Sequence, residues 1–296
     1  MEPLASAAKL QADWSVTATQ LKKTLDLARR GTFVMSGVAA LLAAIASQIP
    51  ESQDRARLAV AVASAVLLGL VSFLTVQLLG SAKTMTWTRI RVASEGLKRE
   101  VYQYAAMAAP YDDPATSDNL LLAEKDKIAN DIDDVIGVIE RSGKPGSLPQ
   151  KRFATPQEYI AVRVKGQIGW LEDRAEQNRR ASVILHRWEF WLALVAAVLT
   201  AAVGVAGKNL FGLPFDFAAL TAVLTTIGGS ILAHIEASRY DYLTVTYRAT
   251  ARRLQSELDH ATAFTMPSQP WSDFVHRCEA ILSAESAAWA AKWSKA

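Results

Sequence analysis

The sequence predicts an all-α integral membrane protein, with four transmembrane helices in two hairpins and a cytoplasmic helical bundle. Four apolar runs of 17 to 23 residues contain no Asp, Glu, Lys or Arg. Because roughly 20 residues of helix cross the ~30 Å hydrocarbon layer of a bilayer, each run has about the length of a membrane span. The composition fits a chain divided between lipid and water, since 51 % of the residues are hydrophobic and 21 % are charged.

The apolar runs come in two pairs. They are residues 33–49, 58–80, 190–207 and 217–235. The links 50–57 and 208–216 are too short to hold a domain, so each pair is predicted to form an antiparallel hairpin. The alternative is a water-soluble bundle with unusually apolar helices. Insertion is favoured over it because a charge-free run of Leu, Ile, Val and Phe gains free energy in the bilayer.

Basic residues favour the inner side of the membrane for the long polar segments. The two links hold only Arg55, Arg57 and Lys208, whereas the flanks hold most of the other arginines and lysines. The positive-inside rule therefore places both termini and the middle segment in the cytoplasm. The lipid bilayer is the first expected partner, and the chain is expected to be a multi-pass protein of the plasma membrane.

Polar helices are predicted to lead into and out of each hairpin. The leading helices cover about 6–32 and 157–189, and the exit helices carry apolar residues at the heptad spacing of a coiled coil. No Pro or Gly-rich stop follows either outgoing apolar run, so each outgoing transmembrane helix is predicted to continue unbroken into its exit helix. The candidate assembly seam on the exit helices is Trp87, Leu97, Tyr104, Tyr247, Leu254 and Leu258.

One offset of 157 residues, without gaps, aligns the two hairpins and their flanks. It places Arg91 on Arg248 and Glu100 on Glu257. This predicts a tandem duplication, with a first two-transmembrane unit over 1–110 and a second over 157–296. Residues 111–156 are predicted to hold an amphipathic helix, reaching to about Arg141, and a Pro/Gly linker. A last helix is predicted over about 271–294.

The second unit resembles the SLATT family, the SMODS and SLOG-associating two-transmembrane effector domains. The resemblance rests on EYIAVRVKGQIGWLEDRAEQNRR before the hairpin, YRATARRLQSELDHATAF after it and CEAILSAESAAWAAKW near the end. It covers residues 155–293 well and residues 10–105 only through the internal repeat. One departure is Leu171, after Trp170, where the family has an aromatic residue. The resemblance implies a membrane effector that acts in bacterial conflict systems responding to nucleotide signals. Members of the family are expected to form pores. The resemblance also implies the bacterial inner membrane and a nucleotide-signalling partner protein.

Polar residues within and beside the outgoing apolar runs are candidates for lining or gating a pore. They are Ser72, Thr75, Gln77, Thr226, Ser230, His234 and Glu236. Polar groups in hydrocarbon usually face protein or water. The favoured interpretation is that they form hydrogen bonds between helices, with His234 and Glu236 simply at the interface. Two hairpins alone do not enclose a pore, so conduction would require a homo-oligomer. The alternative function is that of a non-conducting membrane scaffold or anchor that localises a partner protein.

Catalytic, cofactor-binding and metal-binding residues are not predicted. The single cysteine, Cys278, excludes an intrachain disulfide, and no nucleophile and base are paired within a motif. The net charge of +3 does not suggest nucleic acid, whose binding proteins usually carry a basic stripe. The expectation is that the protein is not an enzyme and has no cofactor.

Overall fold

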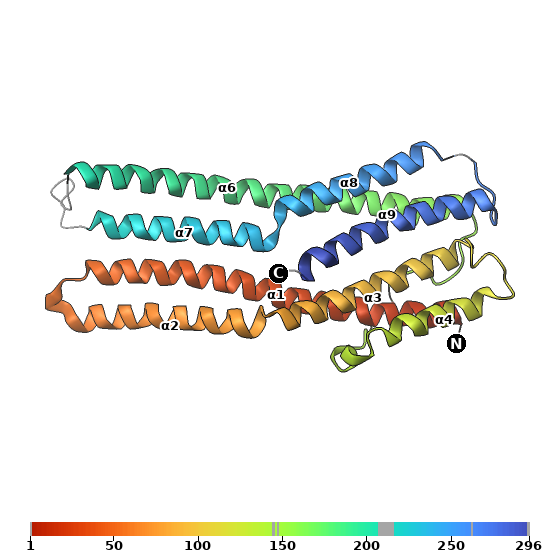
Figure 1. Cartoon of the computed structure of the whole chain (residues 1–296), viewed down its shortest axis with the longest axis horizontal. Coiled ribbons are helices and arrows are strands. Elements are labelled where there is room, and N and C mark those ends of the chain that lie inside the picture. Colours follow the sequence, from red (N-terminus) through yellow and green to blue (C-terminus); the bar gives the residue numbers. More distant parts are fainter. Residues whose placement is uncertain (1, 144–145, 147, 207–215, 262, 295–296) are drawn as a thin grey trace. The chain divides into compact units, whose positions relative to one another are not determined.

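The computed structural model describes residues 2–143, 146, 148–206, 216–261 and 263–294 (Figure 1). Over these residues the fold is all-α, as predicted, and holds four helices long and apolar enough to cross a membrane. The α-helices are α1 (Pro3–Gln48), α2 (Asp54–Leu78), α3 (Ser81–Ala105), α4 (Ser117–Asn130), α5 (Pro156–Tyr159), α6 (Gly166–Ala206), α7 (Phe217–Ser238), α8 (Tyr240–Asp259) and α9 (Gln269–Ser294). Two 3-10 helices, η1 (Glu51–Gln53) and η2 (Asp133–Val138), and a π-helix, η3 (Ile160–Lys165), complete them.

The chain divides into two compact units, each built from separate stretches of sequence. The transmembrane unit comprises residues 24–80 and 177–243, and the head unit comprises 1–23, 81–176 and 244–296. Each half of the sequence contributes helices to both units. These two compact units do not correspond to the predicted repeats. The division of the sequence into two repeats and a linker therefore stays a prediction.

The transmembrane unit exposes its apolar side chains. In the four apolar windows only 6 to 17 % of the residues are buried. Large side chains such as Phe73, Trp188 and Trp191 are more than half exposed. Water-soluble monomers rarely expose contiguous apolar surface on this scale, so acyl chains are the solvent of this unit. The chain is a multi-pass membrane protein.

Specific contacts join the helices of the transmembrane unit. The buried Ser64 hydroxyl of α2 donates to the Ala39 carbonyl of α1 at 2.8 Å. At the start of the apolar run of α1, the Phe33 ring stacks on the His234 ring of α7, with centroids 4.9 Å apart. At the other end, the Asp216 N–H, just before α7, donates to Gln48 Oε1 at 2.8 Å. The order of these contacts makes α1 and α7 antiparallel neighbours that connect the two hairpins (Figure 1).

The head unit has its own core, in which α3 packs against α9 and α4. Large side chains in it, such as Trp14, Trp271 and Phe274, are almost wholly buried. Burial of a large side chain contributes about 1.5–3 kcal/mol, so these side chains help to hold the unit together. The Gln11 amide of α1 also donates to the Ser94 hydroxyl of α3 at 3.2 Å.

The leading helices are continuous, but the exit helices are not. α1 and α6 each form one helix that includes a leading segment and an apolar run. The prediction of unbroken outgoing helices was wrong, since α2 ends at Leu78 and α7 ends at Ser238. The first break lies at Gly80, where a Cβ would lie only 3.0 Å from the Val76 carbonyl oxygen, so glycine fits there better than any larger residue. At the second, Arg239 adopts the left-handed conformation (φ 55°, ψ 37°) that ends a helix.

Other predicted boundaries need smaller corrections. The helix expected to reach about Arg141 ends at Asn130 and is followed by η2. Arg89 contacts this end of the helix, because its guanidinium donates to the Asp131 carbonyl and pairs with the Asp134 carboxylate. The last helix begins at Gln269, close to its predicted start. Gly207, Lys208 and the rest of the second link up to residue 215 lie outside the described residues.

Candidate functional site

The predicted pore-lining hydroxyls lie on the surface of the transmembrane unit. On α7, Thr226 donates to the Ala222 carbonyl at 2.8 Å and Ser230 to the Thr226 carbonyl at 2.9 Å. On α2, the hydroxyls of Ser72 and Thr75 donate to carbonyls four residues back, at 3.1 and 2.8 Å. The proton of each hydroxyl is therefore bound within its own helix. Among the described residues, the row of hydroxyls on each helix makes no hydrogen bond to a neighbouring helix, and it can face another molecule. Hydrogen bonding between helices, the favoured interpretation, is found at Ser64 instead.

The remaining predicted residues of this group have different surroundings. His234 is half-buried against Phe33, and its Nε2 lies 3.5 Å from the Tyr240 hydroxyl. Gln77 and Glu236 are exposed. The structure thus separates His234, which packs between two helices, from Thr226 and Ser230 on the same stripe of α7.

The predicted assembly seam lies in the head unit. Trp87, Leu97, Tyr104, Tyr247 and Leu254 are buried, and Leu258 is half-buried. They pack the interior of the chain's own fold; the Tyr247 ring, for example, lies 5.7 Å from the Trp170 ring. Helical spacing therefore identified a packed face correctly. A role for this face between chains stays a prediction.

A buried ion cluster in the head unit was not predicted. The Arg163 guanidinium donates to both carboxylate oxygens of Glu279, from Nε at 2.8 Å and from Nη2 at 2.7 Å. The Tyr159 hydroxyl donates to the same carboxylate at 3.0 Å, and the guanidinium lies over the Tyr102 ring, 4.2 Å from its centroid. The side chains of Arg163 and Glu279 are only 4 % and 1 % exposed. Two-point pairing of this kind fixes orientation as well as distance.

The electrostatics keep the Arg163 guanidinium charged and the Tyr159 hydroxyl protonated. Burial lowers the pKa of Arg163, but Glu279, Tyr159 and Tyr102 together raise it by more, so the guanidinium stays charged. Burial and the same carboxylate raise the pKa of Tyr159, which keeps its hydroxyl as a donor. Among the described residues, no buried side-chain nitrogen or oxygen atom lacks a partner. A fully satisfied polar network of this kind specifies one packing of the helices around it.

Local structure brings Arg163 to this position. Thr155 caps the start of α5 by accepting from the Glu158 N–H, and the Glu158 carboxylate accepts from the Ala154 N–H at 2.7 Å. Pro156 follows the cap, where its missing N–H is not needed. The π-helix η3 then carries Arg163 towards α9. The signals in the sequence were the TPQE capping pattern and the four-residue spacing of Tyr159 and Arg163.

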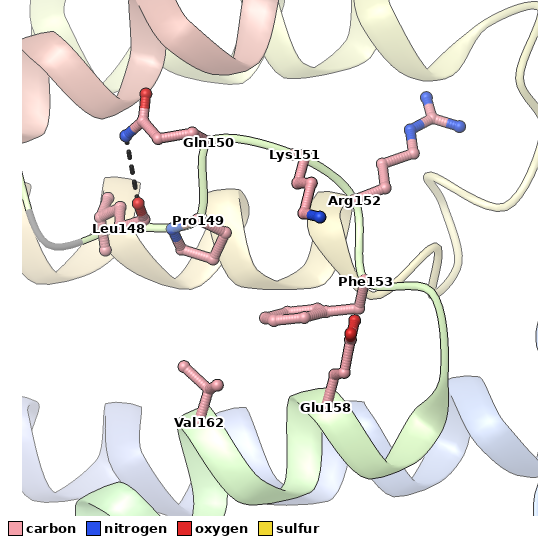
Figure 2. Close-up of a pocket in the computed structure, with 8 residues that line it drawn as sticks. All are labelled: Leu148, Pro149, Gln150, Lys151, Arg152, Phe153, Glu158 and Val162. Carbon is pink, nitrogen blue, oxygen red and sulfur yellow. Dashed lines mark hydrogen bonds between the residues drawn. The ribbon is translucent and has the colours of Figure 1, made fainter.

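A shallow cavity of about 590 Å³ lies in the head unit between the linker and α5–η3 (Figure 2). Leu148, Pro149, Phe153 and Val162 give it apolar walls, while Lys151 and Glu158 place opposite charges at its sides. Arg152 points away, because its guanidinium donates to the Ser117 hydroxyl at 2.7 Å. The described part of the chain has no group of three or more His, Cys, Asp or Glu able to hold a metal.

Comparison with protein families divides the chain as the apolar runs do. Residues 159–289 match the SMODS and SLOG-associating 2TM effector domain 1, SLATT, and so include Tyr159, Arg163 and Glu279. Residues 12–119 match a protein family of unknown function, DUF4231, which is a related two-transmembrane family. Searches of curated proteins and of solved structures returned no match. The family of the second half is an effector family and not a known enzyme family.

Proposed function

Since residues 159–289 form a SLATT domain, we propose that the protein is the membrane effector of a bacterial nucleotide-signalling conflict or defence system. It acts as a homo-oligomer that forms a pore or otherwise perturbs the bilayer. Its place is the bacterial inner membrane, with both termini and the head unit in the cytoplasm. A nucleotide-signalling partner protein supplies the trigger.

The observation that carries the pore proposal is the row of hydroxyls on an otherwise apolar surface. Thr226 and Ser230 lie one turn apart on α7, where Thr226 is exposed and Ser230 is half-buried, and Ser72 and Thr75 on α2 are exposed. The core of a four-helix bundle is filled by side chains, so conduction needs several copies. Copies that turn these faces towards one another would line a weakly polar path, because each hydroxyl oxygen keeps a lone pair for water.

Gating proceeds through the leading helices. α1 and α6 each include residues of the head unit and of the transmembrane unit within a single helix. A continuous helix transmits a rotation or displacement along its length, whereas the breaks at Gly80 and Arg239 interrupt the outgoing helices. A ligand or partner that repacks the head unit would therefore move α1 and α6 in the membrane.

Leucine substitutions on α7 test the pore. Thr226→Leu with Ser230→Leu removes both hydroxyls and should abolish dye entry and depolarisation after induced expression, with membrane localisation unchanged. Thr225→Leu is the matched control, because Thr225 is exposed on the same helix and also donates to its own helix, at 3.0 Å. Flux that survives the double substitution, or is lost equally in the control, contradicts a pore lined by this row.

A non-conducting scaffold that localises a partner is the second candidate. It is favoured by the hydrogen bonds that the hydroxyls of four residues donate to carbonyls four residues back, namely those of Ser72, Thr75, Thr226 and Ser230. Because these donors are already satisfied, they do not require a water-filled path. Under this proposal, induced expression leaves the membrane potential intact, and the full-length chain captures the partner through its head unit. Depolarisation by the wild-type chain would exclude it.

A further inference from the structure

The cavity between the linker and α5–η3 has the size and the lining of a small-molecule site (Figure 2). Its volume of about 590 Å³ lies within the roughly 300–1,000 Å³ of such sites in proteins. Mostly apolar walls with a small number of polar groups are also their usual lining. The lining residues, 148–153, 158 and 162, belong to the head unit, and the proposed pore uses none of them. We name this cavity the linker cavity.

The fold holds the walls of the linker cavity in place. The Phe153 N–H donates to the Ala105 carbonyl of α3 at 2.8 Å, and the Phe153 ring meets the Tyr159 ring edge-on, with centroids 5.9 Å apart. Leu148 is buried, and its carbonyl accepts from the Gln150 amide at 3.1 Å (Figure 2). Because these walls are already ordered, a ligand loses little free energy in ordering them.

The π-helix η3 forms an accessible wall of the linker cavity. It lies inside a helical stretch that otherwise continues from α5 into α6. Single π-helical turns within α-helices occur frequently at functional sites. Val162 of η3 is 56 % exposed beside the cavity. An apolar ligand that covers Val162 therefore gains free energy, because apolar surface is removed from water.

Lys151 supplies an available positive charge at the linker cavity. Its side chain is exposed, and within the described residues its ammonium makes no hydrogen bond or ion pair. Arg152 points away, since its guanidinium is bound to the Ser117 hydroxyl. The Glu158 carboxylate already accepts from the Ala154 N–H at 2.7 Å. A ligand in the cavity thus meets apolar walls and one cation without a partner.

We propose that the linker cavity binds a small organic anion with an apolar body. The apolar part covers Phe153 and Val162, and the anionic group pairs with the Lys151 ammonium. A neutral ligand of the same shape lacks this attraction, and a cation is repelled by the ammonium. The site is independent of the proposed effector function, since a scaffold could bind the same ligand.

The test uses the full-length protein in lipid nanodiscs and three probes of similar shape. They are phenylacetate, the neutral phenylacetamide and the cationic phenethylamine. Ligand-detected NMR gives the dissociation constants, with empty nanodiscs as the blank. The wild-type chain should bind phenylacetate most tightly. Lys151→Gln should weaken phenylacetate binding about two- to fivefold, the effect of one exposed ion pair, and leave phenylacetamide binding unchanged.

Lys165→Gln is the matched control, because Lys165 is exposed on η3 but does not line the linker cavity. It should bind phenylacetate as the wild type does. Val162→Glu, at an exposed position, places a carboxylate in the wall and should abolish phenylacetate binding. The unfolding midpoint of each variant without a probe establishes that it is folded.

Four results would overturn the proposal. The first is that the wild-type chain binds none of the probes. The second is that phenylacetamide or phenethylamine binds as tightly as phenylacetate, which would assign the cavity to another class of ligand. The third is equal phenylacetate affinity in Lys151→Gln and Lys165→Gln. The fourth is undiminished phenylacetate binding by folded Val162→Glu, which would place the anion elsewhere on the protein.

Discussion

The substitution Glu279→Gln tests the buried ion cluster of the head unit. It nearly preserves volume but removes the charge opposite Arg163, which donates to the carboxylate at 2.7 and 2.8 Å. Both side chains are at most 4 % exposed, so the guanidinium would stay buried without its counterion. Breaking such a pair costs about 3–5 kcal/mol. For a large domain, each kcal/mol lost lowers the thermal unfolding midpoint by about 2–4 °C. The midpoint of Glu279→Gln should therefore fall by roughly 6–20 °C.

A matched control is available on the surface of the same unit. Glu257→Gln breaks the pair with Arg277, whose Nε lies 2.8 Å from the carboxylate but whose side chain is 54 % exposed. Exposed pairs contribute about 0–1 kcal/mol, so this midpoint should barely move. Differential scanning fluorimetry of the detergent-solubilised chain gives both values. A loss for Glu279→Gln no larger than that for Glu257→Gln would refute the reasoning.

Three further predictions concern pH, thiol chemistry and the membrane helices. Burial raises the pKa of Glu95, but Arg91, Lys98 and Arg163 lower it by more, so the folded value lies below the unfolded one. The stability that the Glu95 carboxylate contributes is thus present at neutral pH and lost as pH falls through its folded pKa. Thermal unfolding midpoints measured from pH 7 to 3 should therefore fall less in Glu95→Gln than in the wild type. Equal falls in the two proteins would contradict this. Burial raises the pKa of Cys278 to about 12, so maleimide should label it only after unfolding, and rapid native labelling would contradict the packing. Ser64→Ala should destabilise the detergent-solubilised protein by about 0.6 kcal/mol, since it removes one hydrogen bond between membrane helices, and a loss of several kcal/mol would indicate a larger role.

The sequence was most informative where the signal is local. Charge-free apolar runs identified the helices that can cross a membrane, because length and composition alone decide insertion. Heptad spacing likewise marked Leu97 and Leu254 as members of a packed face, and both are wholly buried. The quoted motifs of the second half pointed to SLATT, which the family comparison confirmed.

Features that depend on the folded chain could not be found in this way. Arg163 and Glu279 are 116 residues apart, and their pairing follows only from the packing of η3 against α9. The break at Arg239 could not be predicted, because no glycine or proline marks it and an arginine rarely adopts the left-handed conformation found there. The row of Thr226 and Ser230 was visible in the sequence, whereas the contact of His234 with Phe33 required α1 beside α7.

Membrane extraction tests the central claim most directly, namely that acyl chains solvate the four apolar helices. After lysis of expressing cells, the full-length chain should sediment with the membranes, resist an alkaline carbonate wash and enter solution only with detergent. Recovery of a folded, monodisperse protein from the detergent-free supernatant would contradict the account, because the exposed apolar surface of the transmembrane unit would then be stable in water.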